Sequence, residues 1–242
     1  MTITLQGDTF IKIFIFCLDL KLPFCSQGIK KFADSLKKSQ KRKMTKLDLS
    51  RCDIGKQGFY ELIPALLRTQ NVTFQGHSLS PLELKEFSTR LTELEDREIK
   101  SLDISSCNLT TESMPQLITF INQIENVDLH NSEFGVESMK LLVKQILENG
   151  TGKLRTLNLR MCKLNDDCLE ILSDVIPKLY SVTLSSNNFS GINAVKSLCY
   201  KIDNSDKIVL KFLDMKYSRL SQDMKKSLGE VCKKHNIDLK VW

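Results

Sequence analysis

Residues 154–164 read Leu-Arg-Thr-Leu-Asn-Leu-Arg-Met-Cys-Lys-Leu, and the same order of apolar and polar positions recurs along the chain. Around Leu157 and Leu159 the apolar and polar residues alternate, which predicts a short strand with one buried face. Asn165 then stands where a helix cap is expected, and apolar residues at helical spacing follow as far as Pro177. The stretch therefore predicts a unit of one strand, one turn and one helix that ends at Pro177.

A pair of apolar residues separated by one residue marks the strand of each unit, and it recurs eight times. Successive pairs lie 25 to 31 residues apart, with shorter and longer steps in alternation. A repeat of this size predicts a solenoid of stacked units, each with a strand on the concave side and a full helix on the convex side. The eight pairs are Leu18 and Leu20, Leu47 and Leu49, Val72 and Phe74, Leu102 and Ile104, Val127 and Leu129, Leu157 and Leu159, Val182 and Leu184, and Leu213 and Met215.

We expect one continuous domain over residues 1–242, because the number of repeats sets the length of a solenoid. The first repeat, at about 10–43, is irregular, and regular repeats follow over about 44–220. A cap is expected over about 221–242, where a helix and a last strand would close the open end of the core.

The cysteines indicate a reducing compartment. The chain has eight of them, and Cys52, Cys107 and Cys162 each follow the second apolar strand residue by three positions, where the repeat needs a small buried group. Buried thiols favour a cytoplasmic protein over a secreted one, although four Asn-x-Ser/Thr triplets are present. No stretch reaches the eighteen or so consecutive apolar residues of a membrane span.

Residues suited to catalysis or metal binding are sparse. The chain has three histidines, no two of them at metal-ligand spacing, and it has no Cys-x-x-Cys motif. No nucleophile motif stands out either, so we expect no enzymatic activity, no cofactor and no metal site. The net charge is +6, but apart from one run at 37–43 the basic residues are spread out, which does not favour a nucleic-acid partner.

The residue between the two apolar members of each pair should face outwards on the concave side. It is an aspartate in five of the eight units, which would form an acidic ladder over the first and middle units. Such a ladder could select a basic helix or loop of a partner protein, and it could also serve only to keep an exposed sheet soluble. The predicted contact residues are Asp48, Asp103, Asp128, Asn158, Arg160 and Lys216.

These units resemble the ribonuclease-inhibitor-like subfamily of leucine-rich repeats. The resemblance is carried most clearly by SLDISSCNL at 101–109 and LRTLNLRMCKL at 154–164, and it covers residues from about 15 to 242. It implies an α/β right-handed horseshoe solenoid of about eight repeats and a non-catalytic role in binding a partner protein. A repeat family of this kind defines the fold far more closely than the partner.

Two other functions remain open from the same resemblance. The subfamily includes an activator of a small GTPase and the sensor portions of NOD-like immune receptors. The chain lacks the acidic tail of the activator and the G-x-x-x-x-G-K-[ST] nucleotide-binding loop that a whole receptor needs. The alternatives are therefore a regulator of a small GTPase and a sensor fragment of a NOD-like receptor in innate immunity.

Overall fold

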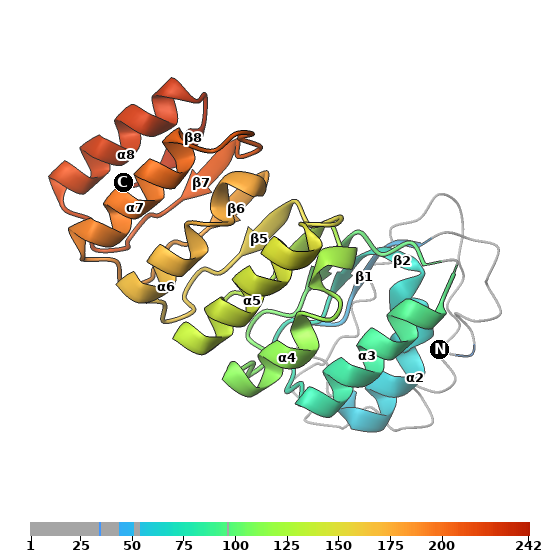
Figure 1. Ribbon diagram of the computed structural model, residues 1–242. Coiled ribbons are helices and arrows are strands. Elements are labelled where there is room, and N and C mark those ends of the chain that lie inside the picture. Colours follow the sequence, from blue (N-terminus) through green and yellow to red (C-terminus); the bar gives the residue numbers. More distant parts are fainter. Residues whose placement is uncertain (1–33, 35–43, 51–53, 96) are drawn as a thin grey trace.

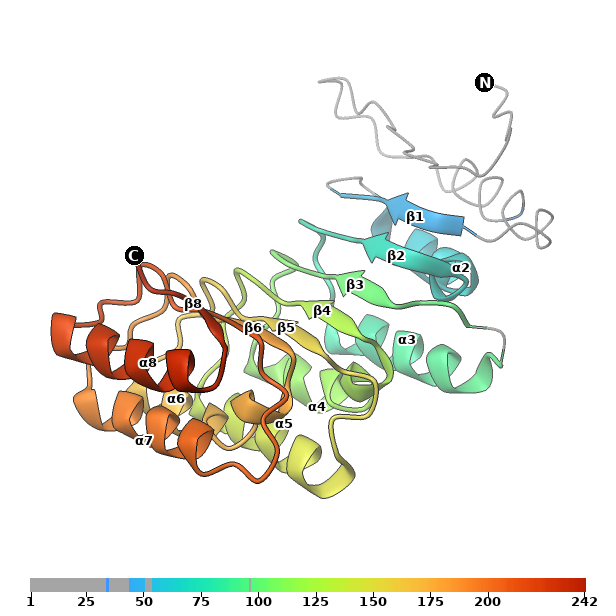
Figure 2. The ribbon, with the colours of Figure 1, turned by 90° about the horizontal axis from the view of Figure 1, so that it is seen from above.

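The computed structural model describes residue 34 and residues 44–50, 54–95 and 97–242. Its strands form one open parallel sheet in chain order. The helices all lie against one face of this sheet and leave its other face uncovered (Figures 1 and 2). The strands are β1 (Met44–Asp48), β2 (Thr69–Thr73), β3 (Ser101–Asp103), β4 (Asn126–Asp128), β5 (Thr156–Asn158), β6 (Ser181–Thr183), β7 (Phe212–Asp214) and β8 (Asp238–Lys240). The helices are α2 (Gly55–Leu67), α3 (Pro81–Glu93), α4 (Met114–Leu117), α5 (Val136–Asn149), α6 (Asp166–Leu172), α7 (Ile192–Asp203) and α8 (Gln222–Lys234).

The predicted fold class is confirmed. Each apolar pair stands in register with the next, as Val127 with Leu157 and Leu157 with Val182, and the second member of each pair is buried just beyond its strand. Strand residues on either side of the buried one are only partly covered, as the alternation predicts. The first predicted pair, Leu18 and Leu20, lies outside the described residues, and so does most of the predicted irregular repeat.

The expectation of a full helix in every unit is wrong in two units. Between β3 and β4 the helix α4 has four residues, flanked by 3-10 turns at Thr111–Ser113 and Ile121–Gln123. Between β5 and β6, α6 ends at Leu172, and Pro177 lies in a separate 3-10 turn, so Pro177 does not end the helix. A 3-10 turn rises about 2.0 Å per residue against about 1.5 Å in an α-helix. A short unit with 3-10 turns therefore covers the length of the helical side with fewer residues.

The unit between β1 and β2 is equally short but keeps a full helix. There α2 has thirteen residues, and Arg68 alone separates its end from the start of β2. A short unit can therefore shorten either its helix or the connection that follows the helix.

In five of the described turns one side chain bonds the turn to the preceding unit. We call its place the bridging position: the third residue after the second apolar residue of the pair, where the sequence has Cys52, Cys107 and Cys162. Its side chain bonds the backbone carbonyl of the second apolar residue of the preceding unit. The bonds are His77 Nε2 to Leu49 at 2.7 Å, Cys107 Sγ to Phe74 at 3.1 Å, Cys162 Sγ to Leu129 at 3.3 Å, Asn187 Nδ2 to Leu159 at 2.8 Å and Ser218 Oγ to Leu184 at 3.1 Å.

These bonds explain why a small polar group is needed at a buried place. The carbonyl oxygen can only accept, so His77 must carry its proton on Nε2. Burial raises the pKa of the Cys107 thiol to about 11 and that of Cys162 to about 12, so both stay protonated and able to donate at neutral pH. Cys52 lies outside the described residues.

Asn187 makes the most complete of these ties. Its Oδ1 accepts the backbone N–H groups of Cys162 and Leu164, each at 3.0 Å, and its Nδ2 donates to the carbonyls of Leu159 and Leu184. Since Asn187 is buried, no water can replace these bonds when its side chain is removed.

We therefore predict that Asn187→Ala lowers the free energy of unfolding by about 3 kcal/mol or more, because it leaves several buried backbone groups without partners. Urea unfolding followed by circular dichroism measures this. The neighbouring exposed Asn188→Ala is the matched control and should stay within about 0.5 kcal/mol of wild type. Equal effects of the two changes would contradict the role given to Asn187.

Ser132 is the exception at the bridging position. It is 3% exposed, and its hydroxyl has no hydrogen-bond partner among the described residues. We predict that Ser132→Cys raises the free energy of unfolding by about 1 kcal/mol, because the longer side chain reaches toward the Ile104 carbonyl as Cys107 and Cys162 reach theirs. Ser132→Ala, which only removes the unpaired hydroxyl, should fall between wild type and the cysteine variant. A cysteine variant less stable than the alanine variant would refute the proposed bond.

Candidate functional site

The predicted contact residues lie along the concave strand side. Asp48, Asp103, Asp128 and Asn158 end β1, β3, β4 and β5, and all four are partly exposed. The register aligns Asp103 with Asp128 and Asp128 with Asn158, so these three lie side by side, whereas Thr73 separates Asp48 from Asp103. Arg160 and Lys216 each follow the outward residue of β5 and β7 by two positions.

The outward aspartates also close the turns that follow their strands. Asp103 Oδ1 accepts the backbone N–H of Ser105 at 3.0 Å and its hydroxyl at 2.5 Å, and Asp128 Oδ1 accepts the N–H of His130 at 2.9 Å. Asn158 does the same for Arg160 through its amide oxygen, at 3.0 Å. An Asx side chain that bonds the N–H two residues on is a standard turn, so part of this row is explained by local structure.

Sequence reasoning had assigned the row either to a partner or to solubility, and it missed this turn. The signal was present as an Asp or Asn at the same place in consecutive units, directly before a turn. Because Asn158 makes the same bond as its aspartate neighbours, the turn needs an oxygen acceptor rather than a negative charge.

Asp128 is the centre of a small polar network. Its Oδ2 accepts from Asn158 Nδ2 at 2.8 Å, and its Oδ1 lies 3.0 Å from His130 Nδ1. Asp103, Asp128 and His130 each offer one possible ligand atom, all within 4.8 Å of one another. The Oδ1 atoms of both aspartates already accept backbone N–H groups, and these hydrogen bonds account for the arrangement by themselves.

The concave side changes sign along the solenoid. On the first four strands its outward charged residues are Lys46, Asp48, Asp103 and Asp128. On the last four strands and the residues just after them they are Arg160, Asp214, Lys216, Asp238 and Lys240, of which three are positive, and Lys240 forms an ion pair with Asp238 at 2.9 Å. A partner that crosses the whole sheet would therefore meet an acidic end and a basic end.

The turns on the same edge enclose a pocket of about 250 Å³. Met161, Asn131 and the buried Ser132 line it, and an ion pair between Lys163 and Glu133 lies at its side. It is open to solvent and its lining mixes polar and apolar groups, so it belongs to the same exposed edge as the strand ends.

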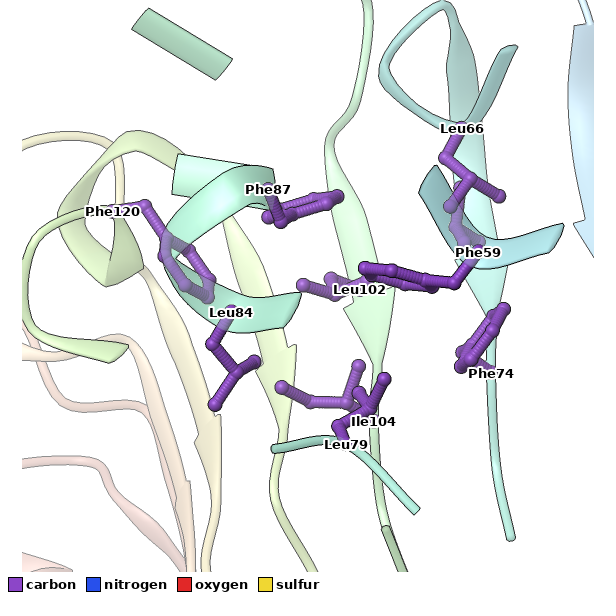
Figure 3. Close-up of a pocket in the computed structure, with 10 residues that line it drawn as sticks. Phe59, Leu66, Phe74, Leu79, Leu84, Phe87, Leu102, Ile104 and Phe120 are labelled. Atoms are coloured by element: carbon purple, nitrogen blue, oxygen red, sulfur yellow. The ribbon is translucent and has the colours of Figure 1, made fainter. Parts of the chain in front are cut away.

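A second hollow among the described residues lies inside the core and is too small for a ligand. Figure 3 shows it among the rings of Phe59, Phe74, Phe87 and Phe120 and the surrounding aliphatic side chains, with a volume of about 10 Å³. The rings of Phe59 and Phe74 meet edge to face at 5.0 Å, and those of Phe87 and Phe120 at 5.2 Å. An apolar void of this size stays dry, so it is a packing gap between units.

Comparison with known proteins agrees with this geometry. A family model described as Leucine Rich repeat matches residues 40–62. The chain is a leucine-rich-repeat solenoid. Among solved structures, an internalin of Listeria monocytogenes superposes with a TM-score of 0.50 and 13% identity, over 89% of this chain and 61% of the internalin.

The repeats are similar to those of proteins that also contain NACHT and PYD domains. The mouse protein "NACHT, LRR and PYD domains-containing protein 5" is 27% identical over 164 residues, which cover 64% of this chain and 14% of that protein. The human "NACHT, LRR and PYD domains-containing protein 13" is 26% identical over 170 residues, or 67% of this chain and 16% of that protein. The chain thus corresponds to about one seventh of the length of these relatives, and the predicted resemblance to NOD-like receptor repeats is confirmed.

No helix within residues 34, 44–50, 54–95 and 97–242 combines the length and the apolar content needed to cross a bilayer.

The double role of the aspartates leads to a prediction that separates charge from structure. Asp103→Asn should leave the free energy of unfolding within about 0.5 kcal/mol of wild type, because the amide oxygen still accepts from Ser105. Asp103→Ala should lower it by about 1 to 2 kcal/mol, because both bonds are lost. Chemical denaturation measures both variants, and an equally large loss in the asparagine variant would mean that the charge itself stabilises the turn.

Proposed function

We propose that this leucine-rich-repeat protein is a non-catalytic module that binds a partner protein through its concave strand side and the adjoining turns. The observation that carries the proposal is the open sheet itself, whose outward row is charged and which no helix of the described residues covers (Figure 2). The proposed contacts are the predicted ones: Asp48, Asp103, Asp128, Asn158, Arg160 and Lys216.

The acidic end suits a basic helix or loop of the partner. Asp103 and Asp128 stand on adjacent strands, which in a sheet lie about 4.8 Å apart, so one cationic side chain can interact with both carboxylates. Charge complementarity of this kind raises the association rate and excludes wrong partners more than it adds affinity.

A second candidate is the sensor portion of a NOD-like immune receptor. Similarity to proteins with NACHT, LRR and PYD domains supports it, over about two thirds of this chain. Sequencing full-length transcripts from the source cells tests it. Transcripts that join these repeats to a nucleotide-binding domain would support this candidate, and transcripts that never do so would refute it.

The cytoplasm is the compartment we propose. Cys107, Cys162, Cys168 and Cys232 are buried and unbridged, and burial raises the pKa of the Cys232 thiol to about 12. Thiols kept in this form are typical of a reducing compartment.

The test of the main proposal uses variants that keep the turns intact. A triple variant with Asp48→Asn, Asp103→Asn and Asp128→Asn removes three negative charges and retains an oxygen acceptor at each turn. Affinity capture from a lysate of the source cells, with quantitative mass spectrometry, should show specific proteins that wild type binds and this variant loses by about tenfold.

The matched control removes three negative charges from the exposed helical side, with Glu112→Gln, Glu170→Gln and Glu230→Gln. It should bind the same proteins as wild type. If the concave variant and the control capture the same proteins in the same amounts, the concave side is not the binding surface.

A further inference from the structure

Large side chains stand exposed at one end of the concave side. We call this surface the C-terminal patch and define it as Arg160, Met161, Lys216, Tyr217, Arg219 and Trp242. Tyr217 is 77% exposed, Trp242 71% and Met161 44%, which is unusual for residues of this size in a chain whose other turns carry small polar groups.

The backbone conformation at Met161 and Tyr217 also disfavours large side chains, so the stability of the fold does not explain their presence. In the six described turns after β2 to β7 the second residue has a positive φ, and in four of them it is Gly76, Ser106, Asn131 or Ser186. In the turns after β5 and β7 it is Met161 and Tyr217, both with φ of 56°. A bulky side chain is disfavoured in this left-handed region, and neither residue is buried in return.

The strand register places Met161 and Tyr217 two units apart, close enough for one partner segment to contact both. Backbone bonds join Met161 to Ser185 at 3.1 Å and Ser186 to Lys216 at 2.8 Å, so the turns follow one another like the strands. The small Ser186 therefore lies at the position between those of Met161 and Tyr217. Neighbouring strands are about 4.8 Å apart, so the two positions are roughly 10 Å apart, the reach of a few residues of extended chain.

The charge of the patch is positive. Among the described residues, Arg160, Lys216 and Arg219 form no ion pair with a carboxylate. Lys225 adds a further positive charge at the edge of the patch, since its ammonium lies 4.2 Å from the centroid of the Trp242 ring. Arginine, tyrosine, tryptophan and methionine are also the residue types enriched at protein interfaces.

We propose that the C-terminal patch binds an acidic segment of a partner protein that also carries apolar side chains. The cations would pair with its carboxylates, and the exposed side chains of Met161 and Tyr217 would contact its apolar side chains. This inference rests on the proposed protein-binding function, and it specifies which chemical groups of the partner the basic end of the concave side would bind. A nucleic acid fits less well, because its uniform negative charge would meet Asp214, which accepts the backbone N–H of the patch residue Lys216, and the carboxylates of the acidic end.

The probe is a library of random 12-residue peptides displayed on phage and selected on the full chain. Enriched peptides are then made with a fluorescein label, and their dissociation constants are measured by fluorescence anisotropy. We expect enriched sequences with net negative charge and at least one aromatic or aliphatic residue. A variant with Arg160→Glu, Lys216→Glu and Arg219→Glu should bind them at least about tenfold more weakly.

The control carries the same charge change on the helical side, with Lys196→Glu, Lys226→Glu and Lys233→Glu, and should bind within about twofold of wild type. Tyr217→Asn tests the apolar contact and checks folding at the same time. Asparagine tolerates a positive φ, so this variant should melt no lower than wild type and still lose at least about fivefold in affinity.

The opposite results overturn the proposal. An empty selection, enriched peptides that are not acidic, unchanged affinity in the reversed variant, or tighter binding of a mixed-sequence 20-nucleotide single-stranded RNA would each do so. If the patch fails in this way while the variant with Asp48→Asn, Asp103→Asn and Asp128→Asn still loses its captured partner, the concave binding function stands and only the acidic-segment inference falls.

Discussion

The bond from the bridging side chain to the carbonyl of the preceding unit is the interaction on which the regularity of this solenoid depends. Most of its strands have only three residues, so the backbone ladder between two units is short. The turn beyond each strand would leave a buried carbonyl without a partner if no side chain reached it. Histidine, cysteine, asparagine and serine all fill the position because each can place one donor there.

Because this bond lies inside the turn, the outward side chains of the concave side are not needed to hold neighbouring units together. In the turn after β3, for example, the side chain of Cys107 bonds the preceding unit and the carboxylate of Asp103 bonds the turn backbone. The other outward side chains of such a turn contribute little to the stability of the fold. Arg160, Met161 and Tyr217 occupy such positions, where a side chain can change without disturbing the core.

Much of the fold could be predicted from the sequence. Each repeat must bury apolar side chains at fixed positions, so the spacing of apolar residues reveals the repeat. The seven pairs from Leu47 to Met215 all fall where expected, and Asn165 caps its helix by accepting the N–H of Cys168. The short helix α4 was not predicted, because the side chains of Met114, Leu117 and Ile121 are buried alike in an α-helix and in a chain of 3-10 turns. The Asx turns were missed because the spacing of buried apolar residues carries no information about a hydrogen bond between a polar side chain and the backbone of the next turn. The residues proposed for partner binding stay a prediction.

Because Ser132 makes no bridging bond, the units of β3 and β4 are joined differently from the other described units between β1 and β7. In a stack where each unit touches only its neighbours, cooperativity passes from one end to the other through every successive junction. The junction between β3 and β4 has its backbone bonds but lacks the bridging bond that the other described junctions from β1 to β7 possess. Two other side-chain bonds join these units, from Asn126 to Ser101 at 2.9 Å and from Asn131 to Ser106 at 3.0 Å. These bonds are partly or fully exposed, so water competes for them, and the coupling of the two halves of the solenoid depends there on the backbone ladder and the apolar core.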